Sequence, residues 1–309
     1  MMRSLKEAGD LNGKRVLVRV DWNVPIVDGE VRDDFRIRKS LPTLEFLKSA
    51  GAKVIICTHL EPEDLTVEAL KKYVPGGAEL LENLRKNPGE KSNSLDFAKE
   101  LASLADIFVN EAFSESHRKY ASIVGVPKFI PSFLGLGFEK EIQNLSKAFN
   151  PSHPFLFILG GAKFETKLPL VEKFLSIADE IFIAGANAKP AFDAGFSKYP
   201  KISFPNGDMV APDADENVIS QLSEKIEKSS FILWNGPLGV YEQGYKEGTI
   251  KLAQILAQSG KEVIVGGGDT LTTIKEQDLL SKFTFVSSGG GAMLDFLANG
   301  TLPGIEALG

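Results

Sequence analysis

The stretch VIVGGGDTLTTI, residues 263–274, indicates how this chain is built. An apolar run ends in consecutive glycines, and an acid, a hydroxyl and a segment typical of a helix follow. The stretch VSSGGGAMLDFL, residues 286–297, repeats the arrangement. A strand that ends in a glycine turn and leads into a helix is typical of parallel α/β folds. In such folds ligands bind beyond the carboxyl ends of the strands.

Apolar runs that predict strands alternate with amphipathic segments that predict helices. Helical patterns lie, for example, at 38–51 and 247–261. Strands this continuously apolar predict parallel sheets covered by helices on both faces. We therefore expect an α/β fold with two doubly wound parallel-sheet lobes. The strand-like runs are residues 15–20, 53–59, 106–113, 155–161, 180–185, 230–236, 262–268 and 283–290.

Chain length and a pair of prolines indicate where the lobes divide. With about 150 residues per domain, 309 residues predict two domains. A charged helical pattern at 138–150 leads into PSHP, residues 151–154, which is typical of a linker. We therefore expect a first domain at 1–137, a hinge helix and linker at 138–154, and a second domain from 155 to 290.

Composition excludes several classes of protein. A net charge of −6 argues against a dedicated nucleic-acid binder. No apolar stretch approaches the roughly 18 residues of a membrane span, and the first residues lack the apolar core of a signal peptide. Cys57, the only cysteine, lies in an apolar run and is most simply a core residue. We expect a cytoplasmic protein that binds neither nucleic acid nor membrane.

The residues that follow the predicted strands differ between the two halves. Glycine-rich segments such as LGGAKFETK and WNGPLGVYE follow the strands of the second half. In the first half the segments VDWN, CTHLE, LLENLR and NEAFSESHR are polar. This division indicates two ligands, of which the first is a small polyanion suited to arginine. The candidate residues are Asp21, Asn23, Arg36, His59, Arg85, His117 and Arg118, whose spacing is not that of a zinc site.

The glycine segments match neither G-x-G-x-x-G nor G-x-x-x-x-G-K-[ST]. One glycine cluster alone indicates only a tight turn, but several at successive strand ends favour phosphate at helix N-termini. Asp269 would be placed to hold Mg²⁺ beside that phosphate, although capping the helix explains it equally well. Lys163 and Lys167, four residues apart, either flank an anion or are solvated surface lysines.

In order along nearly the whole chain, these motifs resemble those of the phosphoglycerate kinase family. The resemblance implies two α/β lobes that close around the hinge, with the C-terminal segment 291–309 packing back toward the first. It also implies a monomer that catalyses reversible phosphoryl transfer between 1,3-bisphosphoglycerate plus ADP and 3-phosphoglycerate plus MgATP. The motifs are VRVDWNVPIVDGEVRDDFRI, LLENLR, NEAF…HR, ILGGAK…K, WNGPLGVYE, GGGDT, GGGAMLDFL and LPGIEAL.

The resemblance also implies a role for individual residues. The triose ligand would contact Asp21, Trp22, Asn23, Arg36, His59, Arg85 and Arg118. The nucleotide would contact Lys167, Asn235, Glu242, Gly267, Gly268, Asp269 and Thr270, with Asp269 on the Mg²⁺ through the phosphates. The transferring phosphoryl group would lie among Arg36, Lys163, Lys167, Gly290 and Gly291.

The sequence also departs from the family pattern. HLEPED replaces the expected Gly-Arg-Pro after His59, so one substrate-binding arginine is absent. DADEN (213–217) stands where the family has a Gly-Pro-Lys loop, AGANA (184–188) replaces a glycine-rich segment, and Tyr120 replaces a histidine. Two alternatives therefore stay open: a diverged kinase for another small carboxylate or acyl phosphate, and a non-catalytic nucleotide-binding relative.

Overall fold

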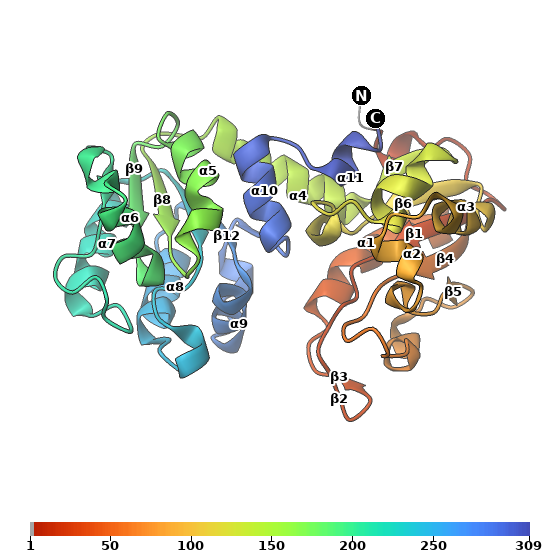
Figure 1. The fold of residues 1–309 in the computed structure, drawn as a ribbon, viewed down its shortest axis with the longest axis horizontal. Helices are drawn as coiled ribbons and strands as arrows, with labels where there is room; N and C mark the ends of the chain where they lie inside the picture. The colour runs from red at the N-terminus through yellow and green to blue at the C-terminus, as the bar shows by residue number, and fades with distance from the viewer. Residues whose placement is uncertain (1–2) are drawn as a thin grey trace. The chain divides into compact units, whose positions relative to one another are not determined.

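The computed structural model describes residues 3–309, which form two compact units (Figure 1). The first unit runs to Gln143 and includes Thr301–Gly309, and the second is Asn144–Gly300. The expected C-terminal segment 291–309 is therefore divided, because helix α10 (Gly291–Asn299) belongs to the second unit. The hinge function expected for 138–154 stays a prediction.

The first unit is built on a parallel sheet in the order β5-β4-β1-β6-β7. Side chains on β1 and β6 are buried almost throughout, so this sheet forms the core of the unit. A short antiparallel hairpin, β2–β3, follows β1. The strands are β1 (Arg15–Arg19), β2 (Ile26–Val27), β3 (Glu30–Val31), β4 (Lys53–Cys57), β5 (Glu79–Leu80), β6 (Ile107–Asn110) and β7 (Ser132–Leu134).

Helices alternate with these strands. The longest, α1, buries an apolar face that includes Ile37, Leu44 and Leu47. Ser94 caps α3 by accepting a hydrogen bond from the backbone N–H of Phe97. The helices of this part are α1 (Phe35–Ser49), α2 (Pro88–Lys91), α3 (Leu95–Ser103), α4 (Leu136–Ser146) and α11 (Pro303–Glu306), with a π-helical turn, η5, at Ala121–Gly125.

The second unit contains a parallel sheet in the order β10-β9-β8-β11-β12-β13. Every residue of β8 and β11 is buried, and Phe155 packs edge-on against Phe174 and Phe231. The strands are β8 (Phe155–Leu159), β9 (Glu180–Ile183), β10 (Ile202–Ser203), β11 (Phe231–Asn235), β12 (Glu262–Gly266) and β13 (Phe285–Val286).

The helices of the second unit form two groups. Helix α5 contacts α10, whereas α8 contacts both α7 and α9. Asp215 caps α7 by accepting from the N–H groups of Asn217 and Val218, so the DADEN segment begins a helix here. The helices are α5 (Phe164–Phe174), α6 (Ala188–Asp193), α7 (Glu216–Lys228), α8 (Glu247–Gln258), α9 (Gly268–Glu276) and α10 (Gly291–Asn299).

This topology confirms the predicted fold class. In each sheet the chain first moves outward in one direction and then returns to the centre and moves outward in the other. That winding places ligands at the carboxyl ends of the central strands, where the direction changes. Across residues 3–309, no helix is both long and apolar enough to cross a lipid bilayer.

A buried carboxylate fixes the start of α4. Glu111 follows β6 and accepts hydrogen bonds from the hydroxyl of Thr43 and the backbone N–H of Gly137. Its side chain fills the space beside two glycines: a Cβ on Gly135 would lie 1.7 Å from Glu111 Oε2, and one on Gly137 would lie 2.1 Å from Oε1. Burial raises the pKa of this carboxyl to about 8.

The Glu111 carboxyl predicts a pH dependence of stability. Because its pKa is raised on folding, the folded state holds a proton that the unfolded state releases above about pH 4.5. The contribution of Glu111 to stability is therefore expected to fall as pH rises from 4.5 to 8, with a slope approaching about 1.4 kcal/mol per pH unit. The stability of the wild type relative to Glu111→Gln should fall accordingly when thermal unfolding of both proteins is measured at pH 5, 6, 7 and 8, because the titration of other groups such as His59 is common to both. An unchanged slope in the variant would contradict the assignment.

Candidate active site

The functional residues expected in the first unit lie where the direction of its sheet changes. β1 and β6 are neighbours, and the chain leaves them toward opposite edges of the sheet. The loop after β1 carries Asp21 and Asn23, and the loop after β6 carries Arg118. Loops that separate in this way leave a crevice for a ligand.

A buried arginine organises this crevice. Arg19, the last residue of β1, is fully buried. Its Nε donates to the hydroxyl of Ser122 at 2.9 Å, and its Nη2 lies 3.1 Å from Nδ1 of His59. The Ser122 hydroxyl in turn donates to Oε1 of Glu90 at 2.6 Å, and Glu90 is also fully buried. The positive charge is thus balanced through one hydroxyl by a carboxylate.

The contact with Arg19 fixes the protonation of His59. A guanidinium carries only donors, so Nδ1 of the buried imidazole must accept and the ring proton lies on Nε2. Burial, together with the neighbouring Arg19 charge, lowers the pKa of His59 to about 2. His59 is therefore a neutral N–H donor rather than a cation.

Asp21 and Arg36 form the next pair. Oδ2 of Asp21 accepts from Nη1 of Arg36 at 2.9 Å and also from the hydroxyl of Ser114. Burial would raise the pKa of Asp21, but Arg36 and the hydrogen bond from Ser114 outweigh it and lower the pKa. The Arg36 side chain is 38% exposed and remains accessible to a ligand.

Trp22, expected among the triose-binding residues, lies in the core of the unit instead. Its side chain is fully buried, and its indole N–H donates to the hydroxyl of Ser40 at 2.8 Å. Its backbone N–H donates to the hydroxyl of Thr58. Trp22 therefore anchors the loop that carries Asp21 and Asn23, and its ring has no surface to offer to a ligand.

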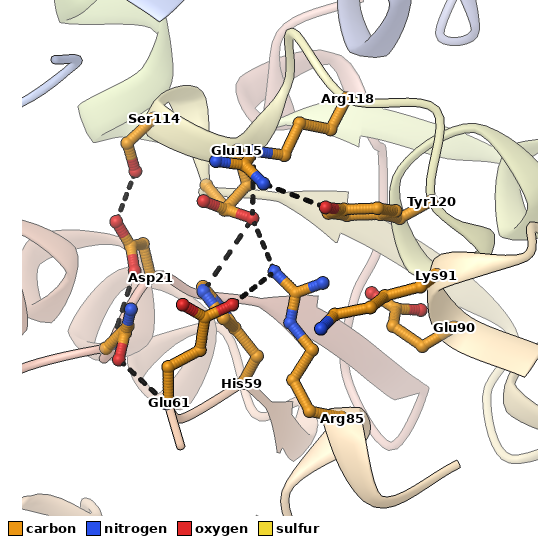
Figure 2. Close-up of polar contacts among 12 residues, drawn as sticks. Asp21, His59, Glu61, Arg85, Glu90, Lys91, Ser114, Glu115, Arg118 and Tyr120 are labelled. Carbon is orange, nitrogen blue, oxygen red and sulfur yellow. Dashed lines mark hydrogen bonds and ion pairs between the residues drawn. The ribbon is translucent and has the colours of Figure 1, made fainter. Parts of the chain in front are cut away.

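One carboxylate oxygen connects Arg85, Arg118 and the neutral His59, as Figure 2 shows. Oε2 of Glu115 lies 3.1 Å from Nη2 of Arg85, 3.7 Å from Nε2 of His59 and 4.0 Å from Nε of Arg118. Burial raises the pKa of this carboxyl. The sequence analysis assigned Glu115 no role, because two of its partners, His59 and Arg85, lie on other loops, while Arg118 follows three residues later on the same loop.

Arg85 is almost completely enclosed. Its side chain is 1% exposed, and the ring of Tyr120 lies 4.4 Å from the guanidinium carbon. Nη1 of Arg118 donates to the Tyr120 hydroxyl at 2.9 Å, so this tyrosine joins the two arginines. Nε and Nη1 of Arg85 are buried and have no hydrogen-bond partner among the described residues. Buried donors without protein partners can bind a ligand or an ordered water.

In the second unit the direction of the sheet changes between β8 and β11. The loops after these strands pack backbone against backbone: a Cβ on Gly160 would lie 2.3 Å from the Pro237 carbonyl oxygen. Likewise, a Cβ on Gly236 would lie 2.4 Å from the Gly160 oxygen, and Gly236 has a φ of 93°. Only glycine fits these positions.

Asn235, expected to bind nucleotide, is buried, and its amide nitrogen lies 3.8 Å from the Met293 sulfur.

The two lysines at the start of α5 have different environments. Lys163 precedes the helix, is exposed, and adopts a left-handed backbone with φ 62°. Such a conformation is uncommon for a residue with a side chain, and it occurs at turns and at functional sites. Lys167 is buried and donates to the Gly160 carbonyl at 2.7 Å. Burial lowers its pKa to about 8.

Acidic and polar groups lie around the start of α9. Burial and the nearby Glu242 charge raise the pKa of Asp269. Thr270 Oγ1 is buried without a hydrogen-bond partner among residues 3–309, and so is Asn187 Oδ1, whose amide nitrogen donates to Gly160. Asn187 is absent from the sequence-based candidates, although it too follows a strand end.

Glycines begin the two helices that follow β12 and β13. Gly267 precedes α9 with a φ of 108°, and Gly290 precedes α10 with a φ of 53°. Gly268 and Gly290 have nothing within 4 Å of the position that a Cβ would take. The first N–H groups of a helix lack partners within the helix, so both helix starts present donors on an open backbone.

A family model described as phosphoglycerate kinase matches residues 5–70, 62–196 and 192–300. The chain belongs to the phosphoglycerate kinase family. It is 34% identical to the phosphoglycerate kinase of Coprothermobacter proteolyticus, over 99% of this chain and 98% of that protein. It is 36% identical to that of Finegoldia magna, over 98% of each. The solved phosphoglycerate kinase of Coxiella burnetii superposes with a TM-score of 0.86 at 28% identity, over 100% of this chain and 99% of that one.

The chain is shorter than these phosphoglycerate kinases by internal segments. The alignment to the Coprothermobacter protein spans 391 positions, more than the 309 residues of this chain can fill. The family match is broken at 62–70 and again at 192–196, which locates two of the differences. The first directly follows Glu61, where the Gly-Arg-Pro of the family is absent.

The His59 geometry predicts an imidazole that does not titrate in the ordinary range. Nitrogen-detected NMR of labelled protein should show His59 neutral and protonated on Nε2 from pH 5 to pH 8, because its pKa is lowered to about 2. His153 is exposed and serves as an internal reference. A His59 ring that becomes doubly protonated above pH 5 would contradict the assignment.

Proposed function

We propose that this chain catalyses the reaction of its family, the reversible transfer of a phosphoryl group between 1,3-bisphosphoglycerate and ADP. The products are 3-phosphoglycerate and ATP. The observation that carries the proposal is the set of oriented cationic and N–H donors in the first unit, at the end of a sheet where an anion is expected. Arg36, His59, Arg85 and Arg118 belong to it, and Arg85 has two donors without partners.

Each group in the first unit has a part in holding the triose ligand. Arg36 and Arg118 are 38% and 45% exposed, so their guanidinium groups can bind carboxylate or phosphate directly. Asp21 orients Arg36, and neutral His59 adds an N–H donor without adding charge. The acceptor is already an anion, so the reaction needs positioning and charge stabilisation rather than a general base.

The second unit supplies the nucleotide site. We assign the nucleotide phosphates to the open helix starts at Gly267 and Gly268, with Glu242 on the ribose hydroxyls and Thr270 Oγ1 as a donor. The buried, unpartnered Thr270 hydroxyl supports this assignment. Lys163, with Gly290 and Gly291 and with Arg36 of the first unit, is assigned to the transferring phosphoryl group, and Lys167 to the adjacent phosphate. Direct transfer requires the two ligands to meet, for which hinge closure stays a prediction.

The residues present fit Mg²⁺ bound together with a nucleotide. Burial, together with repulsion from Glu242, raises the pKa of Asp269, and a divalent cation beside the two carboxylates would favour their charged form. Within the described residues no group of three or more His, Cys, Asp and Glu side chains could hold a metal by itself. The remaining ligands would come from phosphate oxygens and water, which is how Mg²⁺ is usually bound beside nucleotides. There Mg²⁺ would neutralise charge on the transferred group.

A second candidate is a kinase that acts on another small carboxylate. It is favoured by one observation: Glu61 stands where the family has an arginine, and its carboxylate faces Arg85 at 3.6 Å. The two candidates differ in substrate and not in the phosphoryl-transfer chemistry.

The test is a coupled assay with purified protein, MgATP and 3-phosphoglycerate, together with Lys163→Ala. The wild type should turn over with saturation, and the variant should lose about 10²–10³-fold in kcat, the usual cost of removing one charge-stabilising donor. Lys228→Ala is the matched control, because Lys228 is an exposed lysine at the end of α7, just before β11 begins. Equal activities of the two variants would show that Lys163 does not contribute to phosphoryl transfer. No turnover by folded wild type that binds MgADP would favour the other candidates.

Asp269→Asn tests the metal assignment. The Mg²⁺ concentration for half-maximal activity should rise about tenfold or more, because a carboxylate close to the cation is lost. Asp278→Asn, a change of equal charge at the far end of α9, should leave that concentration unchanged. An unaltered Mg²⁺ titration for Asp269→Asn would show that this carboxylate does not serve the metal.

A further inference from the structure

Two carboxylates contact Arg85, and they differ in distance and in exposure to solvent. Its Nη2 lies 3.1 Å from Oε2 of Glu115 and 3.6 Å from Oε1 of Glu61. The Glu115 side chain is 10% exposed, whereas that of Glu61 is 50% exposed. Glu115 is therefore part of the wall of the site, and Glu61 lies at its solvent side.

The backbone of Glu61 is fixed to the site while its side chain is less constrained. Its N–H donates to Oδ1 of Asn23 at 3.1 Å, which ties it to the loop after β1. Among residues 3–309, its carboxylate makes one ion-pair contact, the 3.6 Å contact to Arg85, and its side chain makes no hydrogen bond. A half-exposed ion pair at this distance is weak. The side chain can leave Arg85 without moving the loop.

Arg85 cannot be reached by an anion while this arrangement holds. Its guanidinium is 1% exposed, its face is covered by Tyr120, and Nε and Nη1 have no hydrogen-bond partners in the described part of the chain. Of the two carboxylates on Nη2, only that of Glu61 is substantially exposed. An incoming oxyanion therefore reaches Arg85 by taking the position of Glu61.

We propose that Glu61 is an internal competitor for the anion site: its carboxylate occupies Arg85 in the empty enzyme, and the substrate must displace it. The inference rests on the proposed function, since it assigns the substrate anion to Arg85. It makes Glu61 a residue that sets the affinity for the anionic substrate and takes no part in the phosphoryl transfer. The negative charge of Glu61 raises the substrate concentration that the enzyme needs.

The test is Glu61→Gln, which keeps the length of the side chain and removes its charge. The KM for 3-phosphoglycerate should fall about three- to fivefold, the range of effect for partly exposed ion pairs. The kcat and the KM for MgATP should stay within about twofold of the wild type, because the residue acts before transfer.

Glu63→Gln is the matched control. It removes the same charge two residues further along, from a carboxylate that pairs with Lys91 rather than Arg85. Its KM for 3-phosphoglycerate should change less than that of Glu61→Gln. Equal effects of the two variants on this KM would contradict the proposal, because Glu61 would then act only through the overall negative charge near the site. An unchanged or raised KM in Glu61→Gln would overturn the proposal, the latter because Glu61 would then support binding.

Inorganic sulfate separates this inference from the proposed function. Its dissociation constant, measured by calorimetry without any turnover, should fall by a similar factor in Glu61→Gln relative to wild type and Glu63→Gln. Tighter sulfate binding with no turnover of 3-phosphoglycerate would retain Glu61 as a competitor and reject the assigned reaction. Normal turnover with equal sulfate affinities in all three proteins would support the assigned reaction and contradict the role of Glu61 as a competitor.

Discussion

The first unit depends on one buried charge, the guanidinium of Arg19 at the end of its central strand. A cation removed from water must find partners for its donors, and here they come from Ser122, His59 and the adjacent backbone. Through Ser122 the charge reaches Glu90 on α2, so the helix and the π-helical turn η5 are fixed against β1. The same contact sets the tautomer of His59. One interaction thus holds the fold and prepares the ligand site.

In the second unit, where we propose that the nucleotide phosphates bind, the site depends on close packing of the backbone. The loops after β8 and β11 approach so closely that Gly160 and Gly236 have no room for a side chain. The carbonyl of Gly160 then accepts from both Lys167 and Asn187. Because the loops are fixed to each other, the helix starts beside them are held in place before any nucleotide binds. The first unit relies on side-chain charge, and the second on backbone geometry.

The sequence predicted the long strands well because they are buried on both faces and therefore apolar throughout. It did not predict β2, β3, β5, β7 or β10, whose few residues carry little pattern. Residues at strand ends were good candidates because parallel topology brings them to one edge. The sequence did not predict pairings between loops: nothing local indicates that Glu115 would contact Arg85 and His59, or that Trp22 would lie in the core. Such contacts depend on packing between distant segments.

The carboxylate that fills the space beside two glycines also restricts how this chain can evolve. Glu111 occupies the volume that side chains at 135 and 137 would need, and it holds the start of α4 in return. A larger residue at either glycine is tolerable only after Glu111 has been shortened, and a shortened Glu111 leaves the helix start without its acceptor. The three positions are thus strongly epistatic. Among homologues they should be inherited as a set, so that single exchanges are rare and paired exchanges mark separate lineages.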